Sequence, residues 1–272
     1  MTEETGKLPT ALDKPDAKLW RYIDLQKLIS MLSTRTIFFS RPSAFRDPYE
    51  GWMPRSHMEA LAGINQRYIA QQHDLRREFA AINPNADLTR FNEGIQRNIE
   101  TYAEKAKRAP KEAVQKFGVT CWHKSEYESE AMWSAYPAES VAIESTVGQL
   151  DAANRTDKKV FVDDVRYMDF ESDPIEKGYS QYLLFLKRKS FEHEREVRGV
   201  VLLGEGTDGA FLDYDLDVLV TQIHVSPRAS AEFRHAVSDI VAGKVHPLNK
   251  PVLASTLYEQ PGYGIELKLT ED

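Results

Sequence analysis

Apolar and polar positions near the start of the chain predict a strand, a helix and a second strand in close succession. Residues 19–22 (Leu-Trp-Arg-Tyr) have the pattern of a short strand. Asp24 stands at the position of a helix N-cap, and apolar residues follow it at helical spacing: Leu25, Leu28, Ile29 and Leu32. The β-branched and aromatic run at residues 36–40 predicts another strand. Residues 41–50 contain two prolines, which predict a structured loop.

The pattern changes between about residues 55 and 117, where two long polar stretches with helical periodicity follow one another. They are interrupted at residues 83–85 (Asn-Pro-Asn), and the second is expected to weaken near Pro110. One apolar face is marked by Leu88, Phe91, Ile95, Ile99 and Tyr102. This part is predicted to be a helical insertion or lid between strand-rich parts, rather than a separate domain.

The rest of the chain predicts short strands separated by helices of unequal length. Strands are expected at residues 118–123, 140–144, 159–168, 194–203, 217–225, 252–255 and 264–269. Helices are expected at residues 129–135, 172–187 and 227–243. Scattered short strands favour an α+β fold over a regular parallel α/β layout. We therefore expect one α+β domain over residues 19–272, with the insertion inside it and a flexible N-terminal tail over residues 1–18.

Composition and charge narrow the class of protein. The 272 residues include 42 Asp and Glu against 35 Lys and Arg, for a formal charge of −7, which disfavours coating duplex nucleic acid or an anionic membrane. No apolar run approaches the roughly 18 residues of a membrane span, and residues 1–18 lack the apolar core of a signal peptide. The single cysteine excludes an intrachain disulfide framework and multi-cysteine metal sites. These features predict a cytoplasmic protein with no membrane partner.

Two motifs with a known chemistry match this sequence only weakly. Residues 204–209 spell G-x-G-x-x-G after a predicted strand, but no helical pattern follows to bind a pyrophosphate, so an exposed turn is the better interpretation. Cys121 and His123 would share one face of a strand, where a thiolate–imidazolium pair is conceivable. A lone cysteine on a strand is more often a small core residue. The histidines and the cysteine do not match the spacing of a metal site.

Residues 191–198 (Phe-Glu-His-Glu-Arg-Glu-Val-Arg) carry the most informative charge pattern. In a strand, Glu194, Glu196 and Arg198 project to one face. Two carboxylates so close repel, and Arg198 is placed to compensate them. An edge strand protected by charge is the structural alternative. The functional interpretation is favoured by Arg21, which lies between aromatic residues in the first predicted strand and has no obvious surface role there.

Trp133 and Tyr136, in the sequence Met-Trp-Ser-Ala-Tyr, lie three residues apart and would share a helical face. They form either ordinary core or a stacking wall for a flat ring, with the tyrosine hydroxyl as a polar group.

These segments, in order, resemble a widespread bacterial family of unknown function with the form LYRY…FxxPxxFNDPFE…MWxxYA…GxxIEF…WxxExExR. The resemblance spans residues 19–198 without the insertion, and it departs at Arg46, Pro137, Ser140 and Phe191, where the family has Asn, Ala, Gly and Trp. That family resembles ADP-ribosyltransferases in turn. The resemblance therefore implies a split, mixed or antiparallel sheet core with a helical insertion, and NAD as a substrate.

The same resemblance implies roles for particular residues. Glu196 would be the catalytic glutamate, and Glu194 would help to position the acceptor. Arg21 would contact the NAD phosphates or ribose, and Ser40, or else Tyr136, would fill the middle position of the motif. The remaining residues implied at the cofactor are Tyr22, Trp133 and Arg198. The implied protein is a bacterial toxin or antiphage effector that modifies a protein or nucleic acid and has an antitoxin or regulatory partner.

Two other classes of function stay open. One is a non-catalytic binding or regulatory module on the same scaffold. The other is a hydrolase or nuclease that uses Glu144, Glu194 and Glu196 with a divalent cation. The transferase hypothesis requires Arg21 and Glu196 to converge on one cleft, and it fails if the two side chains point to opposite sides of the sheet.

Overall fold

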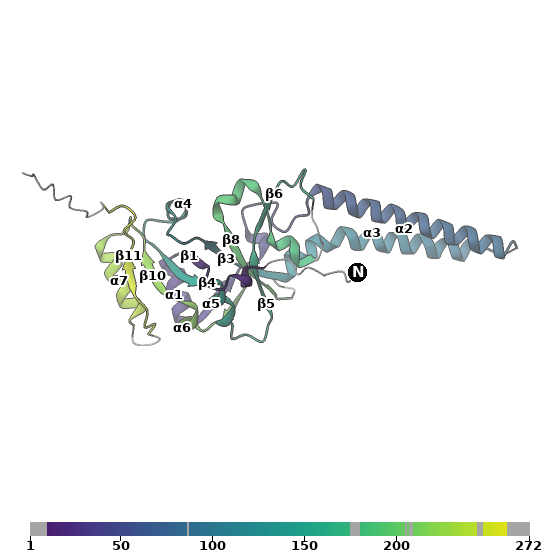
Figure 1. Cartoon of the computed structure of the whole chain (residues 1–272). Coiled ribbons are helices and arrows are strands. Elements are labelled where there is room, and N and C mark those ends of the chain that lie inside the picture. Colours follow the sequence, from purple (N-terminus) through teal and green to yellow (C-terminus); the bar gives the residue numbers. More distant parts are fainter. Residues whose placement is uncertain are drawn as a thin grey trace, which may run out of the picture.

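The computed structural model describes residues 10–85, 87–174, 180–204, 206, 209–243 and 247–259. A mixed sheet with helices on its faces forms its centre (Figure 1). The sheet has seven strands in the order β11-β10-β4-β1-β3-β8-β5, and only β10 and β11 run parallel. The strands are β1 (Lys18–Asp24), β3 (Phe117–Lys124), β4 (Ser140–Thr146), β5 (Val160–Asp164), β8 (Glu196–Leu202), β10 (Gln222–Val225) and β11 (Val252–Ala254). The fold is therefore α+β, as the sequence predicts.

Two smaller strand pairs flank this sheet. The antiparallel pair is β2 (Thr36–Phe39) with β9 (Ala210–Asp213), and the parallel pair is β6 (Arg166–Met168) with β7 (Leu186–Arg188). The α-helices are α1 (Leu25–Thr34), α2 (Arg55–Ile82), α3 (Thr89–Lys116), α4 (Glu130–Ser134), α5 (Val147–Ala152), α6 (Leu216–Leu219) and α7 (Ala231–Val241). Short 3₁₀ helices are η1 (Ala11–Asp13), η2 (Pro42–Ala44), η3 (Ser180–Phe185) and η4 (Lys189–Glu194).

The main core lies on one face of the sheet. Alternate residues of the strands point to this face, where they meet buried residues of α1, α5, α6 and α7. The helices supply Leu28, Met31, Leu32, Val147, Leu150, Leu216, Leu219, Phe233, Val237 and Val241. The opposite face is covered by α4 and by the segment from β6 to η4. Trp20 and Tyr22 of β1 point to that second face, whereas Leu19, Arg21 and Ile23 point toward the core.

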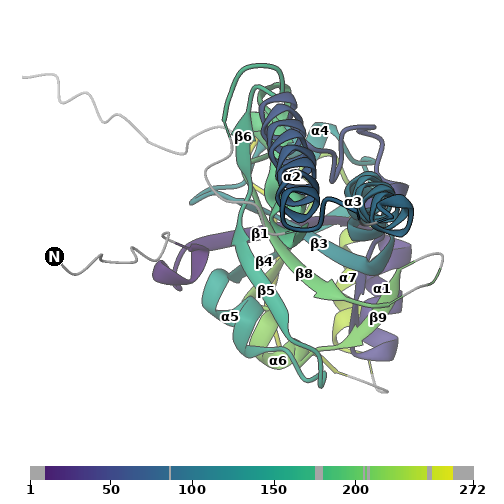
Figure 2. The ribbon, with the colours of Figure 1, turned by 90° about the vertical axis from the view of Figure 1, so that its right-hand side faces the viewer.

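Helices α2 and α3 form a long antiparallel hairpin that projects away from the sheet (Figures 1 and 2). Each helix has 28 residues, about 42 Å at a rise of 1.5 Å per residue. Near its turn, the rings of Phe79 and Phe91 stack with centroids 4.9 Å apart. The predicted break at residues 83–85 is therefore correct. The predicted weakening at Pro110 is not, because α3 continues through that position to Lys116.

Strands β1 and β3 are neighbours along only a small part of their length. Their register contains two pairs, Leu19 with Lys124 and Trp20 with His123. Beyond these pairs the strands separate, and the other end of β3 contacts Ser40 instead, which exchanges two backbone hydrogen bonds with Val119 (2.9 and 2.8 Å). Between these two contacts, none of the described strands pairs with the edge of β3 at Cys121.

Most short elements lie where the sequence places them, because local signals determine them. Asp24 and Ser129 cap α1 and α4 by accepting hydrogen bonds from the backbone N–H groups of Lys27 and Met132. Part of the predicted N-terminal tail is ordered, since Ala11 is buried and its N–H donates to Asp163 (3.0 Å).

Several predicted elements differ from the structure. The strand at residues 159–168 is divided between β5 and β6, which belong to different sheets. The helix at residues 172–187 is not formed over residues 180–187, because residues 183–186 are all buried and leave no polar face. The first part of the predicted strand at 217–225 is the helix α6, which Asp215 caps. The last predicted helix begins later, at Ala231, with Ser230 as its cap. The predicted strand at 264–269 lies outside the described residues.

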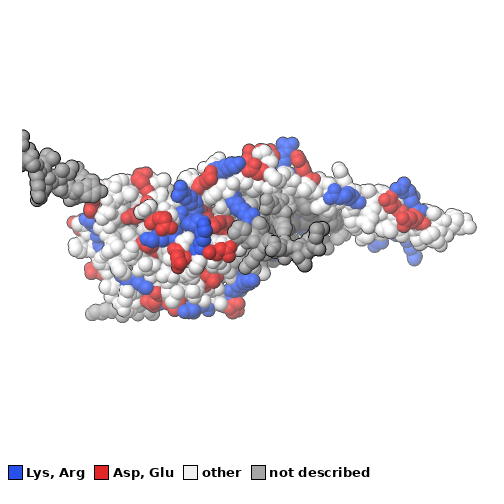
Figure 3. Space-filling model, viewed as in Figure 1, with Lys and Arg blue, Asp and Glu red and all other residues white. Residues whose placement is uncertain are grey.

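On one face of the molecule, side chains of opposite charge lie among one another (Figure 3). On the face seen in Figure 3, Lys and Arg side chains are interspersed with Asp and Glu side chains over the sheet region and along the hairpin. Within the part of the chain that the structure describes, none of the helices has the length and apolarity needed to cross a bilayer.

Candidate functional site

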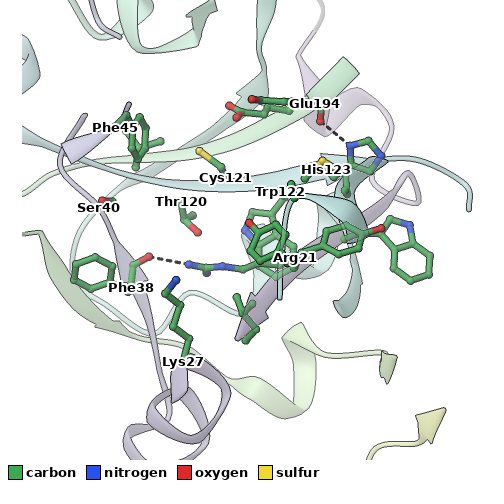
Figure 4. Close-up of a pocket in the computed structure, with 18 of the residues that line it drawn as sticks. Arg21, Lys27, Phe38, Ser40, Phe45, Thr120, Cys121, Trp122, His123 and Glu194 are labelled. Atoms are coloured by element: carbon green, nitrogen blue, oxygen red, sulfur yellow. Dashed lines mark hydrogen bonds between the residues drawn. The ribbon is translucent and has the colours of Figure 1, made fainter. Parts of the chain in front are cut away.

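A cleft of about 1010 Å³ lies where β1 and β3 part. It is at the upper end of the range for small-molecule sites, roughly 300–1,000 Å³. Its walls come from β1, α1, β2, the loop before α2, β3, α4, β7, η4, the start of β8, and β9, and Figure 4 shows some of the side chains that line it. Among the side chains that the structure describes, none of those lining the cleft comes from α2 or α3. The described part of the insertion therefore does not cover the site.

Glu196 is held at one end of this cleft by two cations. Its Oε1 accepts a hydrogen bond from Lys187 Nζ (3.0 Å), and its Oε2 accepts one from Arg198 Nε (2.6 Å). The Arg198 guanidinium is fully buried, and it also pairs with Glu50 and donates to the carbonyl of Leu184 (2.6 Å). Glu196 and Arg198 share one face of β8, as predicted, so the spacing within the strand sets this ion pair.

Glu194 reaches the same place by a different route. It is not on β8 as predicted, but is the last residue of η4, and Arg195 follows it with a left-handed backbone (φ 42°). This turn redirects the chain before β8 begins. The Glu194 carboxylate nevertheless pairs with Lys187, so one ammonium group joins Glu194 to Glu196.

Burial and charge give the two carboxyl groups different protonation states. Burial and a hydrogen bond to Glu196 raise the pKa of Glu194 to about 7. Burial opposes ionisation of Glu196 too, but Arg198, the Glu194 hydrogen bond and Lys187 together hold its pKa at about 2. Burial works against the charge of Lys187 as well, yet the carboxylates raise its pKa above the ordinary value. At neutral pH the site therefore contains one permanent carboxylate and one carboxyl group that can exchange a proton.

Arg21 lies in another part of the same cleft. Its Nη2 donates to the carbonyl of Phe38 (3.1 Å), and its guanidinium is 5.6 Å from the ring of Trp122 (Figure 4). Burial lowers the pKa of Arg21, although a guanidinium stays charged in proteins. Among the described residues no carboxylate pairs with it. A half-buried cation without a counter-ion is costly, so this position favours an anionic ligand.

The register puts Arg21 and Glu196 on opposite faces of the sheet, which is the arrangement expected to exclude the transferase hypothesis. The expected link between opposite faces and separate sites is wrong here, because both residues line one cleft where β1 and β3 part. Glu196 pairs with His123 and His123 pairs with Trp20, so these three share a face, and Arg21 is on the other. The cleft runs past the edge of β3 at Cys121, where residues of both faces are exposed to it. Figure 4 accordingly shows Thr120 and Arg21 on one side of β3, and Cys121 and Glu194 on the other.

Three further predicted site residues line the cleft: Tyr22, Ser40 and Tyr136. The Tyr22 hydroxyl accepts a hydrogen bond from Ser129 N–H (2.9 Å), and burial raises its pKa to about 12. Burial also raises the pKa of Tyr136, so both phenols are neutral and can pack against a ring. The rings of Tyr22 and Tyr136 are 5.9 Å apart.

Trp133 and Arg198 are corrections to the predicted set. Trp133 is completely buried, and its indole N–H donates to Glu128 (2.9 Å) while the ring packs on Tyr22. Trp133 is therefore ordinary core, the first of the two interpretations of its sequence. It packs against Tyr22, which lines the cleft. Arg198 is also inaccessible, so it acts on the cleft through Glu196 and does not contact a cofactor.

The geometry gives little support to two other chemistries, a thiolate–imidazolium pair and a metal site built from carboxylates. Cys121 and His123 do share a face, but burial raises the pKa of the thiol and lowers that of the imidazole, which disfavours a thiolate–imidazolium pair. Glu144 is three strands from Glu196, about 14 Å at the usual strand spacing, and binds Gln222 and His224 instead. Among the described residues, no group of three or more His, Cys, Asp or Glu could hold a metal ion.

Lys187 and Glu50 are the residues that the sequence did not reveal. The sequence predicts Lys187 at the end of a helix, and only the parallel pairing of β7 with β6 brings it to the carboxyl groups. Glu50 did have a signal, because it ends the Asp-Pro-Tyr-Glu sequence that carries part of the family resemblance. Its neighbour Asp47 pairs with Arg188 (2.7 Å), so this loop is attached to β7.

Searches of protein-family models, curated proteins and solved structures find nothing that matches this chain.

Proposed function

We propose that this protein is an NAD-dependent ADP-ribosyltransferase. The observation that carries the proposal is a single cleft with a cation that lacks a carboxylate partner among the described residues, Arg21, and an ionised carboxylate, Glu196, held rigidly by two cations. Arg21 suits a pyrophosphate, and Glu196 suits a positive charge that develops in the transition state. The separation of β1 from β3 supports the proposal, because a split sheet is what the family resemblance implies.

The edge of β3 at Cys121 offers a place for the nicotinamide. Backbone groups of a strand point to alternate edges, so the N–H and C=O of Cys121 face the same way as those of Val119, two residues earlier. Val119 bonds to Ser40, whereas no described strand pairs with Cys121 at that edge. A carboxamide carries one acceptor and two donors, which match a free N–H and C=O. Tyr22 and Tyr136 lie nearby to pack against the pyridine ring.

The chemistry follows from the charge of Glu196. Cleavage of the bond between nicotinamide and C1′ of the ribose leaves positive, oxocarbenium-like charge on the sugar, as in glycoside hydrolysis. The electron pair of that bond leaves with nicotinamide, which becomes neutral. Glu196 is ionised at neutral pH and stabilises the sugar in the transition state more than in the ground state. Lys187 and Arg198 fix the orientation of its carboxylate before substrate binds.

Glu194 is suited to take up the proton of the acceptor. Its pKa of about 7 lies near working pH, where a general base is most effective. It lies beside Glu196 through their common contact with Lys187, so an acceptor activated by Glu194 is close to the reacting carbon. The acceptor in this proposal is a macromolecule, and the biological setting is that of a bacterial toxin or antiphage effector with a regulatory partner. The projecting hairpin is available to dock either one (Figure 1).

The test is incubation of the purified protein with NAD labelled in the adenylate part, in the presence of cell extract or RNA. Nicotinamide release and transfer of label to a macromolecule are expected together, without a requirement for divalent cations. Release that depends on NAD but is abolished by EDTA would instead support metal-dependent chemistry. A protein that neither binds nor consumes NAD would contradict the proposal and favour a non-catalytic module.

Replacement of Arg21 by methionine is expected to weaken NAD binding by about 10- to 100-fold, the effect of losing one charged hydrogen-bonding group of roughly 1.5–3 kcal/mol. The Phe38 carbonyl is the only described hydrogen-bond partner that Arg21 leaves behind, so the fold should be retained. Isothermal titration with NAD measures the effect. The matched control is Arg35→Met, at a half-buried arginine just after α1 that pairs with Asp217. Equal affinity of both variants would remove Arg21 from the binding site.

The rate of transfer is expected to depend on pH through Glu194. Only the ionised carboxylate can accept the proton of the acceptor, so the rate should rise as pH increases through about 7 and then level off. Glu194→Gln should lower the plateau by about 10²- to 10⁴-fold and remove this rise. Nicotinamide release in the presence of acceptor, followed from pH 5 to 9, gives the profile. An unchanged profile in Glu194→Gln would assign the base to another group.

A further inference from the structure

Lys187 fills the space between the two carboxyl groups of the site. Its Nζ contacts Glu194 and lies 3.0 Å from Glu196 Oε1, while its side chain is only 8% exposed. The ring of Phe191 is 4.9 Å from the ammonium and covers it. Lys187 comes from β7, a strand outside the main sheet, so it is independent of the strand that carries Glu196. The cleft reaches this lysine as well as both glutamates.

The charges around Glu194 nearly cancel. The three carboxyl groups of Glu50, Glu194 and Glu196 face the two cations Arg198 and Lys187, so their sum is −1 when Glu194 is ionised and zero when it is protonated. Asp47, another carboxylate that lines the cleft, is paired with Arg188 (2.7 Å). The other groups close by carry no negative charge at neutral pH. They are Tyr167, whose hydroxyl accepts the Glu196 N–H (2.7 Å), His123, whose Nδ1 is 2.6 Å from the Glu194 carbonyl, and Tyr136, His193 and Arg195.

A pair of adjacent carboxylates would ordinarily attract a cationic group that could bridge them. Here a lysine of the chain itself makes that bridge. A guanidinium or ammonium entering the cleft would have to displace Lys187, or would stand beside Lys187 and Arg198 with the same sign of charge.

We infer that the acceptor of ADP-ribose in this protein is a neutral group, a hydroxyl or a neutral amide or base nitrogen, because Lys187 occupies the position in which a cationic acceptor would bridge Glu194 and Glu196. The inference rests on the proposed transferase function and names the acceptor class at that same site. Lys187 is the specificity-determining residue, because it keeps other cations out of the space between the two carboxyl groups.

The step balances for a neutral acceptor. The bond from C1′ to the nicotinamide nitrogen breaks, and its electron pair leaves with nicotinamide. A lone pair of the acceptor oxygen or nitrogen forms the new bond to C1′. The acceptor proton passes to the Glu194 carboxylate and then to water. A guanidinium has no free lone pair until it loses a proton, so it would need an additional deprotonation that a neutral acceptor does not.

The experiment uses agmatine as the guanidinium probe and ethylammonium as a substitute for the lysine side chain. The full chain is compared with Lys187→Ala, with the conservative Lys187→Arg, and with Lys189→Ala as the matched control. Lys189 is two residues away, and its ammonium is exposed and pairs with Asp173. Agmatine binding is measured without NAD by titration and by the shift in melting temperature, and transfer to agmatine is measured with labelled NAD.

Wild type, Lys187→Arg and Lys189→Ala are expected to show no agmatine-dependent stabilisation and no transfer to agmatine. Lys187→Ala is expected to bind agmatine at least tenfold more tightly than wild type, to gain transfer to it, and to recover melting temperature with ethylammonium. If Lys187→Ala is too unstable for kinetics, the melting shift still reports whether a cation fills the space.

The failures of the two proposals are distinguishable. Wild-type protein that transfers ADP-ribose to agmatine would overturn the inference and leave the transferase function standing. A Lys187→Ala variant that gains no affinity for either cation would also overturn it. Wild-type protein that consumes no NAD under any condition would overturn the transferase function, and the acceptor inference with it.

Discussion

Glu196→Gln is expected to lower the rate of nicotinamide release from NAD by about 10²- to 10³-fold. The amide has nearly the shape of the carboxylate but no charge, so it cannot stabilise positive charge on the ribose. It can still accept a hydrogen bond from Lys187 or Arg198 through its one oxygen, although not from both. NAD binding should change much less than the rate, because Arg21 and not Glu196 is expected to hold the pyrophosphate.

The matched control for this variant is Glu192→Gln. Glu192 is four residues earlier, in η4, and its side chain is exposed, so the same chemical change removes a charge near the cleft without touching its ion pairs. Rates of nicotinamide release are compared at equal fractions of folded protein, as judged from thermal melting. If Glu196→Gln and Glu192→Gln release nicotinamide at equal rates, Glu196 is not the catalytic glutamate.

Arg198→Met is expected to lower the free energy of unfolding by about 3–5 kcal/mol, the usual loss when one member of a buried ion pair is removed. Methionine fills much of the same volume but leaves Glu50 without its cation and Glu196 with Lys187 alone. The Leu184 carbonyl also loses its donor. Arg198 joins β8 to two other segments, the one before α2 through Glu50 and the one before β7 through Leu184. Its removal should therefore loosen the contact of β8 with both.

Urea unfolding followed by circular dichroism measures this loss. Arg77→Met serves as the control, since Arg77 is exposed and pairs with Asp74 on the surface of α2. A surface pair of this kind contributes no more than about 1 kcal/mol. A second variant, Arg198→Met with Glu50→Met, should recover part of the stability, because an apolar pair can replace a buried ion pair. Equal stability of Arg198→Met and Arg77→Met would mean that the buried network contributes nothing.

The elements that were predicted correctly are those with a complete local signal. The strand at residues 19–22, the helix after Asp24 and the helix after Ser129 depend on neighbouring residues only. The run at residues 183–186 shows the limit of such signals: its consecutive apolar residues are buried from all sides, and a buried 3₁₀ turn and strand cannot be distinguished from a buried helix by periodicity.

The sequence predicts which types of residue form the candidate site better than it predicts where they lie in space. Spacing along one strand was enough to pair Glu196 with Arg198. It was not enough to place Glu194, because the turn at Arg195 delays the start of β8 to Glu196, two residues after the predicted start of the strand. Trp133 could not be assigned to core or wall from its spacing to Tyr136, because a helical face does not say what packs against it.

The sequence by itself determined the α+β character, the helical insertion, the positions of the main strands and the concentration of carboxylates before β8. These depend on periodicity and on capping residues, which act within a few positions along the chain. Only the tertiary structure decided that β1 and β3 part after two pairs, that Arg21 and Glu196 therefore reach one cleft from opposite faces, and that Lys187 lies between the two glutamates. The physical reason is that sheet order and the packing of a separate strand pair are set by contacts between segments far apart in the chain, and no local pattern carries that information.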